Sequence, residues 1–188
     1  MTGAMRTLLA ALAALLLSGC WLGDSFYTAA DARPAIPAGT YRGLNSNGDP
    51  LPAPIVVTIQ PDGMTRITGS PDQPPLTVGF APLDEAGRSF VSWTAENSLP
   101  GRTGNGSLYG LLQRADNGDL IYYLPGCEDT DAAARAAGAA VEAPTDGPKL
   151  CRFPDRARLE GALRQLHPDP TDPSKLILRL TRIADGQG

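Results

Sequence analysis

The chain has 188 residues, of which 42% are hydrophobic and 19% charged, and its formal net charge is −4 at pH 7. This length is expected to form one domain with extensions, and the hydrophobic share excludes an intrinsically disordered chain. The 16 lysines and arginines form no run, so the composition does not indicate a nucleic-acid-binding groove. The 21 glycines and 18 prolines predict many turns.

The first twenty residues have the layout of an export signal. Arg6 is the only charged residue before Asp24, and an apolar run extends from Leu8 to Leu17. This run is too short to span a bilayer as a helix, which takes about 20 residues. A basic start, a short apolar run and small residues before a break are typical of a secretory signal peptide. Residues 1–19 are therefore predicted to be removed.

The apolar run ends in Leu17-Ser18-Gly19-Cys20, which resembles the lipobox of bacterial lipoproteins. The resemblance implies cleavage before Cys20, a diacylglycerol on its thiol and an acyl chain on its new amine. Three chains anchor a protein firmly, because each buried CH₂ contributes about 0.8 kcal/mol. Trp21 stands where an aspartate would imply retention in the inner membrane, so the resemblance implies the periplasmic face of the outer membrane. The alternatives are an ordinary signal peptide and a buried helix with an incidental cysteine.

The segment after the cysteine has no regular hydrophobic period. Residues 20–37 are therefore predicted to be a lipidated N-terminus and a flexible tether. The tether would hold a single domain, residues 38–184, away from the membrane. The alternative is that Phe26 and Tyr27 dock on the domain or in the lipid interface. Residues 185–188 are expected to fray.

The domain is predicted to consist of short β-strands separated by turn residues. The expected strands are 40–42, 55–60, 64–68, 76–80, 89–93, 108–114, 120–124 and a closing strand, 176–183. The clearest hairpin signal is Asp116-Asn117-Gly118. Such spacing predicts a mainly β fold, either an antiparallel meander or a small barrel-like domain. A barrel of this kind would be loosely similar to lipocalins in its many strands and late helix.

An amphipathic helix is predicted over residues 155–166, where Leu159 and Leu163 follow helical spacing. The hairpin over 108–124 is apolar on both faces, so one face needs a cover in addition to the core of the sheet. We expect the helix to be this cover. A second, looser helix, interrupted by Gly138, is predicted within Asp131–Glu142.

Two cysteines remain once Cys20 is lipidated. The pair Cys127 and Cys151 in an exported protein predicts a disulfide, because the periplasm is oxidising. The alternative is a metal site that includes His167, but zinc takes four close ligands and three candidates exist. The sequence therefore predicts no metal and no cofactor.

Two polar motifs have structural explanations. His167 is the only histidine and follows the expected helix, where a protonated imidazole interacts favourably with the helix dipole. Asn45, Asn47 and Asp49 resemble the start of a calcium loop, but the glycine spacing and the closing glutamate of such a loop are missing. Turn formation accounts for these residues without a metal.

Glycines and arginines each form one further group. The glycines are Gly101, Gly104, Gly106 and Gly110. They carry no phosphate-binding motif and predict a mobile loop between strands. The arginines are Arg152, Arg156, Arg158 and Arg164. They predict a solvated helix face, with a docking surface for an anionic partner as the alternative.

Together these features predict a membrane-anchored periplasmic lipoprotein that acts as a non-catalytic binding or envelope-structural module. One alternative is a calyx for a small molecule or lipid, which would have an apolar pocket inside the barrel. The other is an envelope hydrolase with a carboxylate pair, which would have a carboxyl of strongly raised pKa inside a cleft. No catalytic residue is predicted.

Overall fold

The computed structural model describes residues 21–45, 47–70, 74–94, 107–127, 132–142, 149–166 and 178–183. The strands are β1 (Trp21–Gly23), β2 (Gly39–Leu44), β3 (Ile55–Ile59), β4 (Thr65–Thr68), β5 (Leu76–Pro82), β6 (Ser89–Thr94), β7 (Ser107–Arg114), β8 (Leu120–Tyr123), β9 (Ala140–Glu142), β10 (Leu150–Arg152) and β11 (Leu178–Arg182). The helices are the 3-10 helix η1 (Ala29–Asp31) and the α-helices α2 (Ala132–Ala136) and α3 (Arg156–Gln165).

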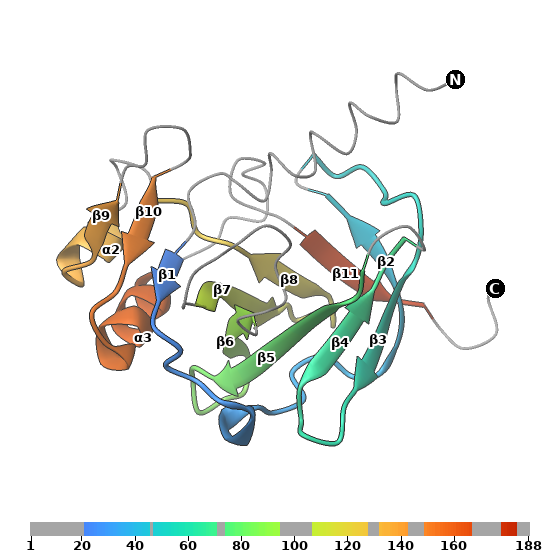
Figure 1. Ribbon diagram of the computed structural model, residues 1–188. Helices are drawn as coiled ribbons and strands as arrows, with labels where there is room; N and C mark the ends of the chain where they lie inside the picture. The colour runs from blue at the N-terminus through green and yellow to red at the C-terminus, as the bar shows by residue number, and fades with distance from the viewer. Residues whose placement is uncertain are drawn as a thin grey trace.

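Eight of these strands form a closed antiparallel barrel. Around the barrel the order is β2-β3-β4-β5-β6-β7-β8-β11, and β11 pairs with β2 to close it (Figure 1). The first seven strands follow chain order, so the barrel is a meander whose last strand comes after the helical segment. The prediction of a mainly β, antiparallel, barrel-like domain is confirmed.

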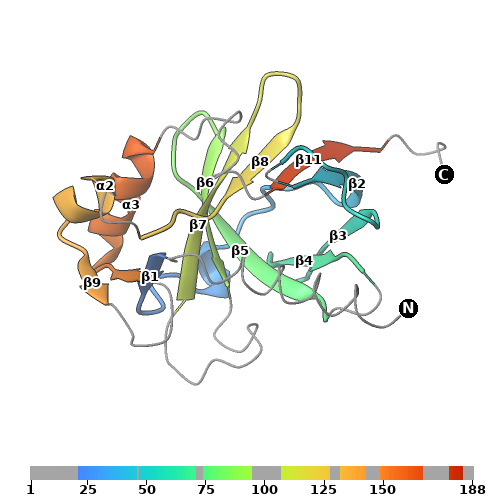
Figure 2. The same ribbon diagram turned by 90° about the horizontal axis from the view of Figure 1, so that it is seen from above.

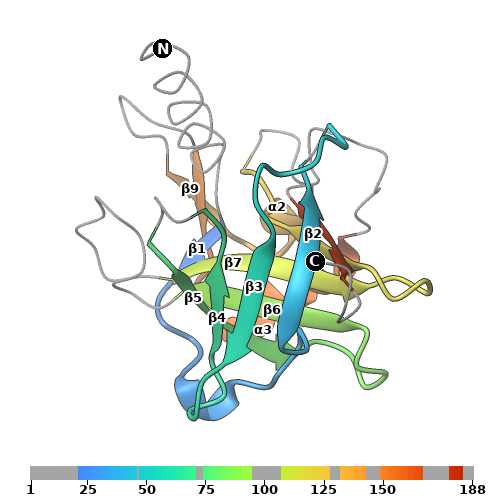
Figure 3. The same cartoon turned by 90° about the vertical axis from the view of Figure 1, so that its right-hand side faces the viewer.

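The barrel wall forms where side chains alternate between interior and exterior. In β3, Ile55 and Val57 are buried, whereas Val56 between them is 44% exposed. β-branched residues favour strands, and a period of two places every second residue on the same face. The register sets Tyr41 opposite Ile55 and Val57 opposite Ile67, so apolar positions meet inside. Figure 3 shows β2, β3 and β4 side by side.

Two apolar cores lie on the two sides of the β6–β7 wall. The inner core fills the barrel and consists of Ala35, Ile36, Tyr41, Ile55, Val57, Val78, Phe80, Phe90, Leu112, Leu120 and Leu180. The outer core lies against the wall from outside and includes Trp21, Tyr27, Val91, Trp93, Tyr109, Leu111, Tyr123, Phe153, Leu159 and Leu163. Leu111 and Leu112 are neighbours in sequence and belong to different cores, as the two-faced apolar pattern requires.

An additional layer covers the outer core. β1 pairs antiparallel with β7 and parallel with β10, and β9 pairs with β10. Figure 2 shows α2 and α3 on this side of the barrel. α3 begins after Asp155, whose carboxylate accepts a hydrogen bond of 2.8 Å from the backbone N–H of Arg158. Leu159, Ala162 and Leu163 form its buried face. Within the described residues, no helix has the length and apolar character that crossing a membrane requires.

The residues predicted as a second helix divide into two elements. α2 ends at Ala136, and Gly138 then adopts a left-handed φ of 72°, a conformation that favours glycine. Residues 140–142 form β9, which pairs with β10. The helix prediction over 131–142 is therefore wrong for its last part. The sequence analysis also predicts neither β1 nor β10, because three-residue strands are too short to show a period.

The prediction of a flexible tether is wrong for residues 21–37. Trp21 is fully buried, with its ring 4.7 Å from that of Phe153. Tyr27 stacks on Trp93 at 4.9 Å, so the docking alternative holds for this residue. Farther along, Ile36 is 1% exposed and belongs to the inner core. Trp21, Tyr27 and Ile36 meet partners in different parts of the fold, which is why no period reveals their burial.

The predicted disulfide is confirmed. Cys127 and Cys151 are bonded, with their Cα atoms 5.3 Å apart, inside the usual range of about 4.4–6.8 Å. The bond joins the segment that follows β8 to β10 and lies in the outer core. It therefore ties the additional layer to the barrel.

Candidate functional site

A groove lies outside the barrel, between α3 and the turn that connects β5 to β6. Its volume is about 560 Å³. Small-molecule sites typically have volumes of about 300–1,000 Å³. We term it the α3 groove; it is lined by Leu83, Asp84, Glu85, Ser89, Leu111, Gln113, Leu163, Arg164 and Leu166.

The floor of the α3 groove is apolar. Leu111 comes from the outward face of β7 and Leu163 from the buried face of α3, and each is 1% exposed. Leu166, which caps the C-terminus of α3, is partly exposed beside them. Helical spacing places Leu163 and Leu166 on one side of α3, above the β7 wall. The floor could therefore desolvate an apolar part of a ligand.

The rim is acidic where the turn between β5 and β6 contributes Asp84 and Glu85. The Asp84 carboxylate accepts a hydrogen bond of 3.0 Å from the backbone N–H of Arg88. Burial alone would raise the pKa of Asp84, but the hydrogen bonds donated by Arg88 and Ser89 outweigh it and lower the pKa below its usual value. Asp84 is therefore ionised at neutral pH, and Glu85 is exposed next to it.

Arg164 forms the opposite rim. Its Nε donates to the backbone oxygen of Leu83 at 3.1 Å, and its guanidinium forms an ion pair with Glu160 at 2.8 Å. The charge of Arg164 is thus shared with an acid outside the groove. The lining thus contains two carboxylates, on Asp84 and Glu85, and one partly compensated cation. Electrostatically, the groove favours a positively charged group over a negatively charged one.

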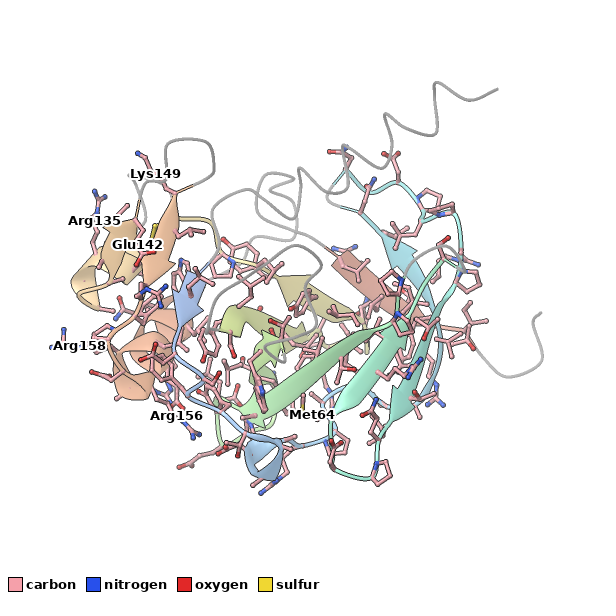
Figure 4. The ribbon with its side chains drawn as sticks, viewed as in Figure 1. Met64, Arg135, Glu142, Lys149, Arg156 and Arg158 are labelled. Atoms are coloured by element: carbon pink, nitrogen blue, oxygen red, sulfur yellow. A yellow bond between two sulfur atoms is a disulfide. The ribbon has the colours of Figure 1, made fainter. Side chains whose placement is uncertain are left out.

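Of the arginines predicted to form a solvated helix face, Arg156, Arg158 and Arg164 are exposed on α3, as expected, and Arg152 lies in β10. They also make specific contacts. Arg156 forms ion pairs with Asp31 at 3.0 Å and with Glu160 at 2.8 Å, and it lies 4.1 Å from the Tyr27 ring centroid (Figure 4). Arg158 donates to the backbone oxygen of Ala137 at 3.2 Å. These contacts hold the N-terminal segment and α2 against α3.

Glu160 is at the centre of this network. It accepts a hydrogen bond of 2.8 Å from the Tyr27 hydroxyl, besides those from Arg156 and Arg164. Burial and the hydrogen bond to Glu160 raise the pKa of Tyr27 far above its usual value. Burial alone would raise the pKa of Glu160, but the hydrogen bonds it accepts outweigh burial and lower the pKa. The cluster fixes the packing of α3 against the N-terminal segment.

The remaining motifs are structural or lie outside the described residues. The Asn45 side-chain oxygen accepts from the backbone N–H groups of Asn47 and Asp49, both at 2.9 Å, and thus closes a turn. Gly110, predicted within a mobile loop, lies inside β7. Cys20, His167, Gly101, Gly104 and Gly106 lie outside the described residues.

Among the described residues, the carboxyl groups with a resolved pKa shift do not favour the hydrolase alternative. Asp31, Asp84 and Glu160 have lowered pKa values, whereas a carboxyl that acts as a general acid needs a raised pKa. In the part of the chain that the structure describes, no group of three or more His, Cys, Asp or Glu residues is placed to hold a metal.

The barrel interior is compatible with a calyx but is densely filled. Phe80, Leu112 and Leu180 are each at most 1% exposed. Eight strands leave an interior that side chains just fill, or that holds one small ligand. Tyr122 is partly exposed, and its hydroxyl lies 3.1 Å from that of Ser92. We therefore take the α3 groove as the candidate site.

Sequence reasoning missed the α3 groove. In the sequence, Asp84 and Glu85 indicate only a turn. No motif connects them to Leu163, which lies about eighty residues later in the chain. The chain matches no protein-family model, no curated protein and no solved structure.

Proposed function

We propose that the chain is a lipid-anchored envelope protein that binds its ligand without catalysis. The ligand has an apolar body and a cationic group and occupies the α3 groove. The observation that carries this proposal is the apolar floor of Leu111 and Leu163 beneath the carboxylates of Asp84 and Glu85. Such a site desolvates apolar surface and attracts a cation at the rim.

The anchor is proposed from the N-terminal sequence. Leu17-Ser18-Gly19-Cys20 follows a short apolar run, and an aromatic residue rather than an aspartate comes next. The disulfide supports an oxidising compartment, because such bonds persist in exported proteins. The protein would accordingly lie on the periplasmic face of the outer membrane, with the bilayer as its first partner through the acylated Cys20.

The anchor predicts that Cys20→Ala prevents lipidation. The variant should lack acyl mass in mass spectrometry of the intact protein and should leave the detergent-soluble membrane fraction. Ser18→Ala, a small-for-small change before the cleavage site, should keep both properties and serves as the control. If Cys20→Ala still fractionates with membranes and the wild type carries no acyl mass, the anchor does not exist.

Charge selectivity tests the groove. Hexylammonium and hexanoate are both six-carbon chains, with apolar parts of similar length and with opposite charges. In an NMR titration, hexylammonium should shift the signals of Leu111, Gln113 and Leu163, and hexanoate should not. Glu85→Gln should weaken hexylammonium binding up to about fivefold, since an exposed ion pair contributes up to about 1 kcal/mol.

The matched control for this titration is Asp116→Asn, which removes a carboxylate that is 96% exposed and does not line the groove. It should leave the affinity unchanged. Equal binding of hexanoate, or equal losses in the two variants, would contradict the groove as a cation-selective site.

A further inference from the structure

The folded domain begins without a spacer at the proposed acylation site. Trp21 follows Cys20 directly, and it is fully buried. Its backbone lies in the sheet between Tyr109 of β7 and Cys151 of β10, and its indole N–H donates to the backbone oxygen of Gly126 at 3.2 Å. Neighbouring Cα atoms are about 3.8 Å apart. A lipid on Cys20 would therefore be attached almost directly to a rigid part of the fold.

The register identifies the surface next to this attachment point. β1 is parallel to β10 with Trp21 beside Cys151, so the start of β1 and the start of β10 at Leu150 lie at the same edge of the sheet. Lys149 precedes Leu150, and both are partly exposed. On the far side of β10, β9 places Val141 opposite Cys151, and Val141 is 48% exposed.

Cations accompany these apolar residues. Figure 4 shows Lys149, which precedes β10, together with Arg135 of α2 and Glu142 of β9 on the same side of the molecule, near the start of β1. Glu142 is neutralised by Arg152, with which it forms an ion pair of 2.7 Å. We term Arg135, Val141, Lys149 and Leu150 the β9–β10 corner.

We infer that the anchored domain lies directly on the bilayer, with the β9–β10 corner against anionic phospholipid headgroups. The inference rests on the proposed lipid anchor. A flexible tether would allow the domain any orientation, but an anchor next to the buried Trp21 brings the neighbouring surface to the headgroups. Lys149 and Arg135 then face phosphate oxygens, and Val141 and Leu150 face the apolar boundary below them.

The same geometry holds the opposite end of the barrel away from the membrane. Asp116 lies in the turn between β7 and β8, seven residues after Tyr109. At about 3.3 Å per residue, the strand carries Asp116 about 20 Å away from Tyr109. Figure 3 shows this hairpin projecting on the side opposite β1 and β9. Gln113 of the α3 groove lies toward this end of β7, so a ligand would enter from the aqueous side.

Fluorescence quenching tests this orientation on the full lipidated protein. Lys149→Cys and Asp116→Cys each add one free thiol, because Cys127 and Cys151 are bonded and Cys20 is acylated. Each variant is labelled with a fluorophore and placed in vesicles of phosphatidylethanolamine and phosphatidylglycerol that carry a headgroup-linked nitroxide. The label at position 149 should lose most of its fluorescence, and the label at position 116 should keep it. Arg135→Cys replaces Lys149→Cys if that variant does not fold.

A spacer variant provides the control. Roughly twelve Gly and Ser residues inserted between Cys20 and Trp21 reach about 20 Å and should abolish the difference between the two labels. Equal quenching without the spacer, or an unchanged difference with it, overturns the inference. Mass spectrometry of the same samples separates the proposed orientation from the proposed anchor. If the quenching result is negative and acyl mass is present, only the orientation is wrong; if acyl mass is absent, the anchor itself is wrong.

Discussion

Replacing Trp21 with alanine is expected to reduce the free energy of unfolding by about 3–5 kcal/mol, as truncation of large buried aromatic residues does. The indole is fully buried, packs on Phe153 and donates a hydrogen bond to Gly126. The substitution would leave a cavity between β1, β10 and the outer core. Urea unfolding followed by circular dichroism measures the loss without relying on tryptophan fluorescence.

Asp24→Ala is the matched control from the same segment. The Asp24 side chain is 85% exposed, and its ion pair with Arg152 is 3.9 Å long. Exposed pairs contribute little, so the change should be under about 0.5 kcal/mol. Equal stability of the two variants would mean that β1 is not integral to the fold. Residues 21–37 would then be a tether, and the direct placement on the bilayer would lose its basis.

The strands of the barrel could be predicted because their signal is local. In β3, an alternating β-branched run is followed by Pro61-Asp62-Gly63, where Gly63 adopts a φ of 83°. β2 to β8 and β11 coincide with the predicted strands to within two residues at each end. The disulfide was predictable as well, because setting Cys20 aside as the predicted lipidation site leaves one pair of cysteines and therefore a single pairing.

Barrel closure could not be derived from local patterns. It depends on the pairing of β11 with β2, in which Leu180 lies opposite Gly43. β2 and β11 are far apart in sequence, so no hydrophobic pattern within either strand indicates that they pair. A Cβ atom at Gly43 would also lie 2.7 Å from the end of the Leu51 side chain, which would have to shift. This close approach is visible only once the strands are placed.

The candidate site was hidden for a similar reason. The α3 groove joins a turn between β5 and β6 to the C-terminal half of α3, and each part has an ordinary local explanation. Asp84 is a typical turn residue, and Leu163 is part of a typical amphipathic stripe. Their combination becomes a site only through the packing of α3 on the outer core. The α3 arginines are exposed as predicted, but their partners could not be foreseen because some, such as Asp31, come from the distant N-terminal segment.

Leu163→Ala and Leu159→Ala should both destabilise the protein, but to different extents. Leu→Ala substitutions in cores cost about 2–5 kcal/mol, and the cost depends on how well the surroundings fill the space that is left. Leu159 is fully buried and does not line the groove, so its removal leaves a closed cavity. We expect a loss in the upper part of this range, measured by urea unfolding. Gln165→Ala, on the exposed side of α3, should change stability by under about 0.5 kcal/mol.

Leu163 should lie in the lower part of the range because its side chain forms the floor of the α3 groove. Truncation there enlarges a space that already opens to solvent, so water fills part of the volume and less contact energy is lost than in a sealed cavity. The difference between the two leucines therefore reports whether the groove is open in solution. Equal losses at Leu159 and Leu163 would mean that the groove is closed when the protein is free. A ligand would then have to open the groove. Because the open, binding-competent state would be only partly populated, the affinity for hexylammonium should be lower than that of a groove already open.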